Sequence, residues 1–428
     1  MKLQCTIQLP SSKSESNRAL MIAAYGGFDP DFQNLSDSKD TLVLKEALRG
    51  LSPMSFLPRH VGERESIGDN PCIIDISDCG TAARFMTTYL ATHDGDWLLT
   101  GSQRMRQRPM APLVETLLSL GAEIQYAEKQ GFLPLQIRGK SISGGKVTMV
   151  MSQSSQFASS LLLAAPMWPH GLEMGLLGDL NSLPYLDLTL AMMRHFGADV
   201  ELKDRTITVR PKPYQPNGFA VSSDWSSASY WYEIAALTKD CEIRLPSLSL
   251  PSLSPSKVRV CTQDDSIIAE WMNPLGVTST EENASVVLRK KTLEKQSFTF
   301  GFSYNPDLFP TMVATCAGLQ VAARFMGVAN LRNKESDRIL AMKMELAKIG
   351  TVLESVSDDE LVLKPSSSLP FFESSAPLRL NAYGDHRIVM ALAPLSLKLG
   401  YLTFDHPEVV EKSYPNYWKE VPFLKVLP

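Results

Sequence analysis

The sequence predicts an α/β protein of two similar domains, each made of three repeats of a βαβαββ unit. Its length of 428 residues is enough for two or three domains. A glycine that follows an apolar helical segment recurs at intervals of 71 to 79 residues, at positions 50, 121, 197, 276 and 350. Short strand-like runs come after each such helix, so strands and helices alternate. Six units of about 70 residues account for the chain, with three units in each domain.

Each repeat contains a helix that ends near its glycine. The segments that carry this ending are residues 47–50, 117–122, 192–198, 271–277 and 346–351. Glycine adopts the left-handed conformation that commonly ends a helix, because it has no side chain to clash. We therefore expect these glycines to mark helix C-termini.

A second series of apolar helices alternates with the first, and each member opens on small polar or acidic residues. The openings are residues 16–21, 80–85, 154–158, 226–230, 307–311 and 384–388. Few charges follow, so these helices should be buried on most of their surface, with Ser, Thr and Asp as N-caps. Helix N-termini attract phosphate and carboxylate groups. Six separately capped core helices are one interpretation; the recurrence favours a shared cleft that binds a multiply anionic small molecule.

Cationic side chains cluster at or beside these openings. The clusters lie in residues 13–18, 104–108, 334–338, 386–387 and at Lys412. A positive charge beside a helix N-terminus opposes the helix dipole, which is tolerated more readily when an anion is bound there. A solvated surface position is the alternative for any single arginine.

Composition and missing motifs exclude several classes of protein. The formal charge is −4, from 42 Lys and Arg against 46 Asp and Glu, which argues against nucleic-acid binding. No apolar run approaches the roughly 18–20 residues of a membrane span, and the short apolar stretch 19–25 lacks a cleavage site, so we expect a cytoplasmic protein. The six cysteines have no C-x-x-C spacing, so we expect reduced thiols and no metal site.

Eight segments, in order along the whole chain, resemble the EPSP synthase (3-phosphoshikimate 1-carboxyvinyltransferase) family. Residues 9–20 resemble its L-P-G-S-K-S-x-S-N-R-A-L segment, with Ser11 in place of glycine. The other seven matches are residues 80–84, 104–109, 154–157, 182–187, 334–338, 384–387 and 412–415. Eight ordered motifs make the resemblance specific.

The resemblance implies two domains of three βαβαββ units about a pseudo-threefold axis, an inside-out α/β barrel. Residues 13–222 would form an inserted domain, mainly on the shikimate 3-phosphate side. Residues 1–12 with 223–428 would form the second domain, which carries the catalytic acid and base. The active site would lie in the interdomain cleft of a monomer, without metal or organic cofactor.

The implied reaction moves the enolpyruvyl group of phosphoenolpyruvate onto the 5-hydroxyl of shikimate 3-phosphate and releases phosphate, on the route to chorismate and aromatic amino acids. Asp307 would be the base toward the hydroxyl, and Glu335 the acid toward the methylene carbon. Lys13 would stabilise the tetrahedral intermediate between the two substrates.

The resemblance also implies two sets of binding residues. Those for shikimate 3-phosphate are Lys13, Ser14, Arg18, Ser154, Ser155, Gln156, Ser182, Asp307, Asn330 and Lys334. Those for phosphoenolpyruvate are Lys13, Gly80, Arg108, Gln156, Arg338, Arg387 and Lys412.

The chain departs from the family pattern at Asp78, Phe85 and Leu183, where Asn, Pro and Lys are usual, and residues 50–74 match poorly. Asp78 should repel an anion unless Arg84 or Arg108 neutralises it.

Two other functions are compatible with parts of this pattern. A UDP-N-acetylglucosamine enolpyruvyl transferase would have Lys-Asn after its first strand and a reactive Cys in a loop. Here Ser14 follows Lys13, and residues 104–108 contain no Cys. A non-catalytic anion-binding relative is the other alternative; the presence of every expected catalytic residue argues against it.

Overall fold

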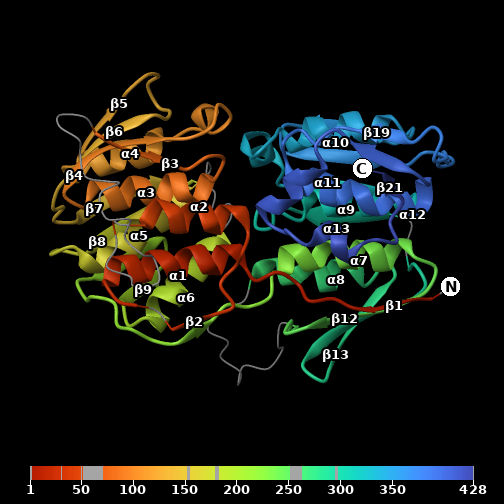
Figure 1. Cartoon of the computed structure of the whole chain (residues 1–428), viewed down its shortest axis with the longest axis horizontal. Coiled ribbons are helices and arrows are strands. Elements are labelled where there is room, and N and C mark those ends of the chain that lie inside the picture. Colours follow the sequence, from red (N-terminus) through yellow and green to blue (C-terminus); the bar gives the residue numbers. More distant parts are fainter. Residues whose placement is uncertain are drawn as a thin grey trace. The chain divides into compact units, whose positions relative to one another are not determined.

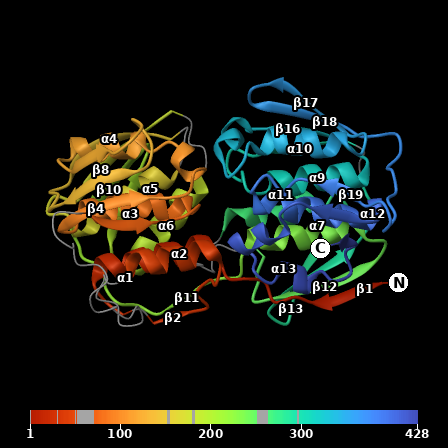
Figure 2. The same cartoon turned by 45° about the horizontal axis from the view of Figure 1, so that its top comes forward.

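The computed structural model describes residues 2–29, 31–49, 51, 71–151, 155–178, 183–250, 263–294 and 297–427. The chain folds into two compact units (Figures 1 and 2). We call residues 12–221 the insert unit, and residues 1–11 with the described part of 222–428 the host unit. Each unit has a hydrophobic core of its own.

Four sheets of the described chain have four strands in the same order. Their first two strands are parallel, and the third and fourth are antiparallel to their neighbours. Those in the insert unit are β3 (Cys72–Asp75), β4 (Gly95–Thr100), β6 (Leu135–Gly139), β5 (Glu123–Tyr126), and β7 (Gly145–Val150), β8 (Leu172–Leu177), β10 (Thr206–Arg210), β9 (Asp199–Lys203). Those in the host unit are β1 (Leu3–Thr6), β12 (Cys241–Pro246), β14 (Ser285–Lys290), β13 (Val277–Glu282), and β15 (Ser297–Gly301), β16 (Ala322–Met326), β18 (Glu360–Lys364), β17 (Val352–Ser357).

Two further sheets are smaller and parallel. One joins β2 (Phe32–Gln33) and β11 (Phe219–Ala220), and the other joins β19 (Leu378–Leu380), β20 (Leu402–Phe404) and β21 (Val426–Leu427).

Helices connect these strands in the order βαβαββ wherever a sheet has four strands; in the sheet of β1 the insert unit interrupts that order after the first strand. The helices of the insert unit are α1 (Lys13–Gly26), α2 (Lys39–Leu48), α3 (Gly80–Ala91), α4 (Ala111–Ser119), α5 (Ser155–Ala164) and α6 (Leu183–His195). Those of the host unit are α7 (Trp225–Leu237), α8 (Ile268–Met272), α9 (Phe309–Leu319), α10 (Arg338–Ala347), α11 (His386–Leu392), α12 (Ser396–Leu399) and α13 (Tyr417–Glu420).

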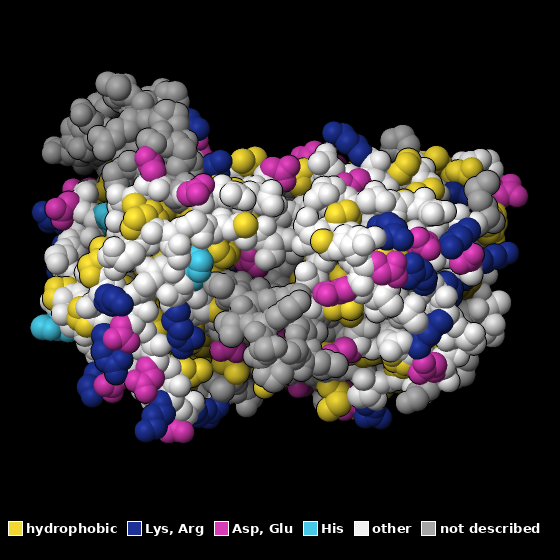
Figure 3. All heavy atoms as spheres, turned by 90° about the horizontal axis from the view of Figure 1, so that it is seen from below, with side chains coloured by type: hydrophobic (Ala, Val, Ile, Leu, Met, Phe, Trp, Pro, Cys, Tyr) yellow, Lys and Arg dark blue, Asp and Glu magenta, His cyan; other side chains and the backbone are white. Residues whose placement is uncertain are grey.

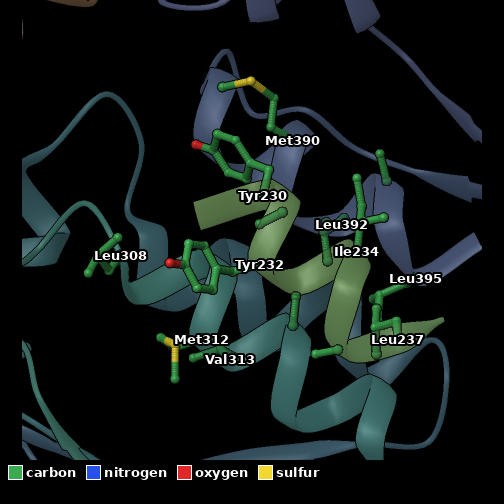
Figure 4. Packing of buried hydrophobic residues seen from close by; sticks show 14 of the residues in the cluster. Tyr230, Tyr232, Ile234, Leu237, Leu308, Met312, Val313, Met390, Leu392 and Leu395 are labelled. Carbon is green, nitrogen blue, oxygen red and sulfur yellow. The ribbon is translucent and has the colours of Figure 1, made fainter. Parts of the chain in front are cut away.

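The helices of the second series are buried as expected. Helices α1, α3 and α5 contribute to the core of the insert unit, and α7, α9 and α11 to that of the host unit. Every residue of α7 is buried, because all of its side chains except Glu233 are apolar, aromatic or small. In Figure 4 its Tyr230 lies beside Met390 of α11, and its Ile234 lies beside Leu392 of the same helix.

The repeated glycines end helices in the left-handed conformation. The φ angles of Gly121, Gly197, Gly276 and Gly350 are 92°, 86°, 95° and 75°. After α4 the following amide, Ala122 N, donates back to Leu117 O over 3.0 Å, and equivalent bonds follow α6 and α10. The prediction is confirmed for Gly121, Gly197 and Gly350. Gly276 instead closes a turn after α8, which already ends at Met272. Gly50 lies outside the described residues.

The expected N-caps are only partly correct. Asp385, in the predicted opening 384–388, does accept from the first turn of α11. Helices α1 and α7 begin earlier than predicted, and Ser12 and Asp224 accept from their first turns. Helix α3 is capped by the Cys79 sulfur instead. Helix α9 has no side-chain cap, so the expectation for its acidic opening, Asp307, is wrong: arginines bind that carboxylate instead.

On the face drawn in Figure 3, Lys and Arg side chains alternate with Asp and Glu. Among the described residues, no helix is both long and apolar enough to cross a bilayer. Five cysteines of this part of the chain are free thiols, and Cys79, Cys241 and Cys316 are buried. Cys261 lies outside the described residues.

Candidate active site

A buried arginine organises the candidate site of the host unit. Arg338, the first residue of α10, is 1% exposed and binds three carboxylates. Its Nη1 lies 2.9 Å from Asp307 Oδ1, its Nη2 3.0 Å from Glu335 Oε2, and its Nε 2.9 Å from Asp385 Oδ2. Burial lowers the pKa of Arg338, but the three carboxylates outweigh burial and raise it. The guanidinium is therefore permanently charged and fixed in place.

A second arginine approaches the same aspartate from α11. Arg387 Nη2 lies 2.7 Å from Asp307 Oδ2, so the two carboxylate oxygens bind different guanidinium groups. Asp385 Oδ1 accepts from Arg387 N, which caps α11, while its Oδ2 holds Arg338 and Ser336. The N-termini of α10 and α11 and the segment that precedes α9 thus meet at one place.

These cations keep Asp307 ionised. Burial alone would raise the pKa of Asp307, but the charges of Arg387, Arg338 and Lys334 together hold it well below its ordinary value. The carboxylate is thus negative throughout the neutral pH range, as a general base must be.

The remaining expected residues of the host unit lie on nearby segments. Lys334 and Glu335 are half-buried between the 3-10 helix Ala329–Asn333 and α10. Asn330 lies in that 3-10 helix, and its Oδ1 is buried without a hydrogen-bond partner. Lys412 is 9% exposed in the 3-10 helix Pro407–Lys412, which packs on α11.

In the insert unit, two arginines lie over the N-terminus of α3. A Cβ placed on Gly80 would come within 2.6 Å of Arg108 Nη1 and 2.9 Å of Arg84 Nη1. Arg84 is held by the carbonyls of Gly80 and Pro109, at 3.0 and 3.3 Å. Two guanidinium groups and the N-terminus of a helix therefore converge, which suits a phosphate or carboxylate.

Three helix N-termini meet beside this point. Lys13, the first residue of α1, lies 3.0 Å from Asp40 in the first turn of α2. Cys79 Sγ, at the start of α3, donates to Asp40 O over 3.5 Å. Lys13 is 18% exposed at its side chain, so Asp40 holds an ammonium group that solvent still reaches.

The start of α5 joins the start of α3. Gln156 Nε2 donates to Thr81 Oγ1 over 3.2 Å, and Ser155 beside it is buried. Ser14 is half-buried at the start of α1, and Arg18 one turn later is buried. The Arg18 guanidinium donates to Thr189 and to two backbone carbonyls. Ser154 and Ser182 lie outside the described residues.

Not every predicted cationic cluster belongs to the site. Arg106 binds Glu128 at 2.9 Å and the Thr100 hydroxyl, and Arg104 is exposed. Arg106 thus has the surface role that was the alternative, whereas Arg108 turns toward α3.

A hollow in the insert unit lies away from these residues. It measures about 820 Å³, between α4 and the strands β7, β8 and β10, and none of the expected site residues lines it. Its lining holds a Lys146–Glu173 ion pair at 3.0 Å but no set of converging cations. We therefore place the candidate site at the helix N-termini. The described residues hold no group of His, Cys, Asp and Glu side chains that would bind a metal.

Sequence reasoning missed Asp40, Asp385 and Asp265, the last a buried carboxylate described below. Each of them comes close to a predicted site residue, or to the turn that carries one, only after the chain has folded. A weak signal existed for Asp385, which stands in the matched segment 384–387. Asp40 and Asp265 stand in unremarkable polar segments, so only their contacts identify them.

Comparisons with known proteins point to one family. A family model described as EPSP synthase (3-phosphoshikimate 1-carboxyvinyltransferase) matches residues 1–421. A 3-phosphoshikimate 1-carboxyvinyltransferase of Bacteroides fragilis (strain YCH46) is 39% identical over 98% of this chain and 95% of its own. That of Mannheimia succiniciproducens is 33% identical over 97% and 95%.

A solved structure is also similar. The EPSP synthase of Acinetobacter baumannii superposes with a TM-score of 0.69 at 21% identity, covering 99% of this chain and 96% of that one. This likeness supports the two-domain α/β fold. Since the family model and full-length relatives above 30% identity agree, the chain belongs to the EPSP synthase family, the 3-phosphoshikimate 1-carboxyvinyltransferases.

Proposed function

We propose that the chain transfers the enolpyruvyl group of phosphoenolpyruvate to the 5-hydroxyl of shikimate 3-phosphate, with Asp307 and Glu335 as base and acid. Family membership supports the reaction. One observation supports the assignment of residues: both carboxylates bind the same buried guanidinium, that of Arg338. This arrangement fixes the separation between the proposed base and the proposed acid. It also places both beside cations that suit an anionic substrate.

Asp307 takes the hydroxyl proton as the hydroxyl oxygen bonds to the central carbon of phosphoenolpyruvate. Glu335 gives a proton to the methylene carbon, which becomes a methyl group of the tetrahedral intermediate. In the second step a methyl proton returns to Glu335 and phosphate leaves with the proton held by Asp307, so the enolpyruvyl ether remains and both carboxyl groups regain their starting state. Protons and bonds balance without a redox partner.

The ion pairs indicate how Asp307 gains basicity. Without substrate, its two oxygens bind Arg338 and Arg387, which hold its pKa low. A substrate phosphate or carboxylate competes for the same guanidinium groups and reduces their effect on Asp307. The base is therefore weak until phosphoenolpyruvate is bound, which limits unproductive proton exchange.

Cations of both units bind phosphoenolpyruvate in this proposal. In the host unit these are Arg338, Arg387 and Lys412. In the insert unit Arg108 lies over Gly80, Gln156 lies at the adjoining helix start, and Lys13 lies at the start of α1. Lys13, held by Asp40, would stabilise the developing charge of the intermediate.

Shikimate 3-phosphate would bind polar groups of the same two regions. These groups are Lys13, Ser14, Arg18, Ser154, Ser155, Gln156, Ser182, Asp307, Asn330 and Lys334. The unpaired Oδ1 of Asn330 supports its place among them, since a buried acceptor without a partner is rare.

Each unit would be a domain of three βαβαββ repeats about a pseudo-threefold axis, with boundaries at residues 13–222 and at 1–12 with 223–428. The recurring strand order of the four larger sheets supports this. The two smaller sheets would belong to the two remaining repeats, which have fewer strands. The protein would act as a monomer in the cytoplasm.

The test is phosphate release by Asp307→Asn and Glu335→Gln with shikimate 3-phosphate and phosphoenolpyruvate. We expect kcat to fall by about 10²- to 10⁴-fold in each, as for loss of a general base or acid. Calorimetric binding of shikimate 3-phosphate should stay measurable. Asp358→Asn is the control, since that side chain is fully exposed. Wild-type turnover in both variants would refute the assignment.

The acceptor is tested in the same assay. UDP-N-acetylglucosamine is not favoured, because the chain matches the EPSP synthase family over nearly its whole length. Phosphate release with that acceptor alone would reverse this conclusion. No release with either acceptor would indicate a non-catalytic relative.

A further inference from the structure

Asp265 is a buried carboxylate that the proposed reaction does not use. It is 4% exposed and lies in the 3-10 helix Asp264–Ile267 of the host unit. The Ser226 hydroxyl, from the first turn of α7, donates to Asp265 Oδ2. Asn305 Nδ2, from the segment before α9, lies 3.2 Å from Asp265 Oδ1. Asp265 thus joins three elements that are distant in the sequence.

Asn305 forms the turn that presents Asp307. Its carbonyl accepts from Leu308 N over 3.1 Å, so Asp307 lies inside this turn. Its side-chain amide also donates to Asp264 Oδ2 over 3.0 Å. Helix α9 has no side-chain cap of its own. The position of Asp307 therefore depends on Asn305, and Asn305 is anchored on Asp265.

We propose that Asp265 is a positioning residue for the reaction: it anchors the Asn305 turn that aims Asp307, and its charge state governs how strongly Asp307 attracts a proton. The proposal rests on the proposed role of Asp307 as the base. It assigns Asp265 no contact with substrate.

The charged groups around Asp265 support this coupling. Burial and the negative charge of Asp307 raise the pKa of Asp265 to about 7, against the lowering effects of Ser226, Arg387 and Asn305. Asp264 neighbours it on the same 3-10 helix but is exposed. Asp224 is bound by Gln263, with its Oδ1 2.8 Å from Gln263 Nε2.

The coupling acts in both directions. An ionised Asp265 makes it easier for Asp307 to accept a proton, because two neighbouring negative charges repel. When Asp307 takes the proton of the substrate hydroxyl, its charge is neutralised, and Asp265 loses its own proton more readily.

The test is the pH profile of kcat for Asp265→Asn in the full chain, between about pH 6 and pH 8. Asn resembles the protonated form of Asp, so the variant should stay at the low plateau that the wild type approaches in acid. We expect kcat to be about tenfold lower at pH 8 and the rise near pH 7 to be absent, with the KM of both substrates changed less than about threefold. A residue that only supports the fold would lower the whole profile and leave its inflection in place.

Two variants serve as controls. Asp264→Asn removes an exposed charge that binds the same amide, and it should keep the inflection. Ser226→Ala removes a donor that lowers the pKa of Asp265, so the inflection should move to higher pH. This variant still tests the proposal if Asp265→Asn does not fold.

The outcomes separate this inference from the proposed function. If Asp307→Asn is inactive while Asp265→Asn keeps the wild-type kcat and inflection, only the role of Asp265 is overturned. An unmoved inflection in Ser226→Ala would also overturn it. If Asp307→Asn is fully active, the base assignment fails, and the role of Asp265 fails with it.

Discussion

The cations at the helix openings bind carboxylates of the same chain. Lys13 binds Asp40, and Arg338 and Arg387 share Asp307. These pairs offset most of the cost of burying the charges, whereas removing one partner of a buried pair typically costs about 3–5 kcal/mol. An anionic substrate must therefore exchange places with internal carboxylates rather than enter an empty cationic site.

The departure at Asp78 predicts a change in donor affinity. Asp78 is exposed, accepts from the Ser102 hydroxyl, and lies two residues before Gly80, over which Arg84 and Arg108 converge. Its charge should repel phosphoenolpyruvate, so we expect Asp78→Asn to lower the KM for phosphoenolpyruvate by about two- to fivefold, with a smaller effect at high salt.

The measurement is initial-rate kinetics at two ionic strengths. Asp96→Asn, which neutralises an exposed side chain on β4, is the matched control and should leave this KM unchanged. A higher KM in Asp78→Asn would contradict the repulsion argument.

A buried carboxyl group in α7 predicts a pH-dependent stability. Glu233 is 0% exposed, and neither of its oxygens has a hydrogen-bond partner. Burial raises its pKa well above the ordinary value of 4.5. The folded state therefore keeps a proton that the unfolded state loses above that value, and stability falls as pH rises, by up to about 1.4 kcal/mol per unit.

We expect Glu233→Met to be more stable than the wild type at neutral pH, by about 1–3 kcal/mol, because no unpaired polar group is buried. Urea unfolding at about pH 5 and pH 8 should show a smaller pH dependence in the variant. Glu373→Gln, at an exposed position, is the control. An equal pH dependence in wild type and Glu233→Met would disprove the explanation.

At the scale of elements, the repeat is defined by how its helices end. The glycines after α4, α6, α8 and α10 all have positive φ angles. Each lets the chain leave the helix and enter a strand within a few residues, so the same βαβαββ order recurs without similar side chains.

The contribution of the left-handed glycine backbone to stability can be measured separately from side-chain packing. A Cβ on Gly121 or on Gly301 would meet no atom within 4 Å, but only Gly121 has a positive φ, 92°. We expect Gly121→Ala to destabilise the protein by about 1 kcal/mol, from the left-handed backbone alone. Gly301→Ala should change stability by no more than about 0.5 kcal/mol. Thermal unfolding of both variants is the measurement, and equal losses would contradict the conformational argument.

At the scale of the whole molecule, the host unit includes a strand, β1, that precedes the insert unit in the sequence. Strand β1 pairs in parallel with β12, and Ile7 and Leu9 after it are buried in the host core. The insert unit is continuous in sequence and has its own core. Pro10 O accepts from Asp224 N over 2.9 Å, and Ser11 forms an antiparallel β-bridge with Ser223. The two ends of the insertion are therefore close.

These facts predict the behaviour of fragments. Residues 12–221 expressed alone should unfold cooperatively. Residues 222–428 should be markedly less stable than the same segment with residues 1–11 joined to it by a short glycine linker, since burial of Ile7 and Leu9 contributes about 3–6 kcal/mol. Circular dichroism melts measure both; equal midpoints for the two host versions would show that β1 is dispensable.

Local patterns in the sequence determined much of this protein. The helix endings at Gly121, Gly197 and Gly350 and the six buried helices follow from backbone preferences and from runs of apolar residues, which are properties of neighbours in the chain. The ordered motifs also identified the family. The capping role expected for Asp307 failed, because a local rule cannot anticipate a stronger partner from elsewhere.

The tertiary structure alone decided which charges meet. Asp307 binds arginines 31 and 80 residues away, Lys13 binds Asp40, and Asp265 joins Ser226 to Asn305. Ion pairs and buried hydrogen bonds depend on distance and on exclusion of water, and both are set by how separate elements pack. For that reason the spacing of charges in the sequence indicated an anionic site, but it gave neither the partners nor the pKa values of its carboxylates.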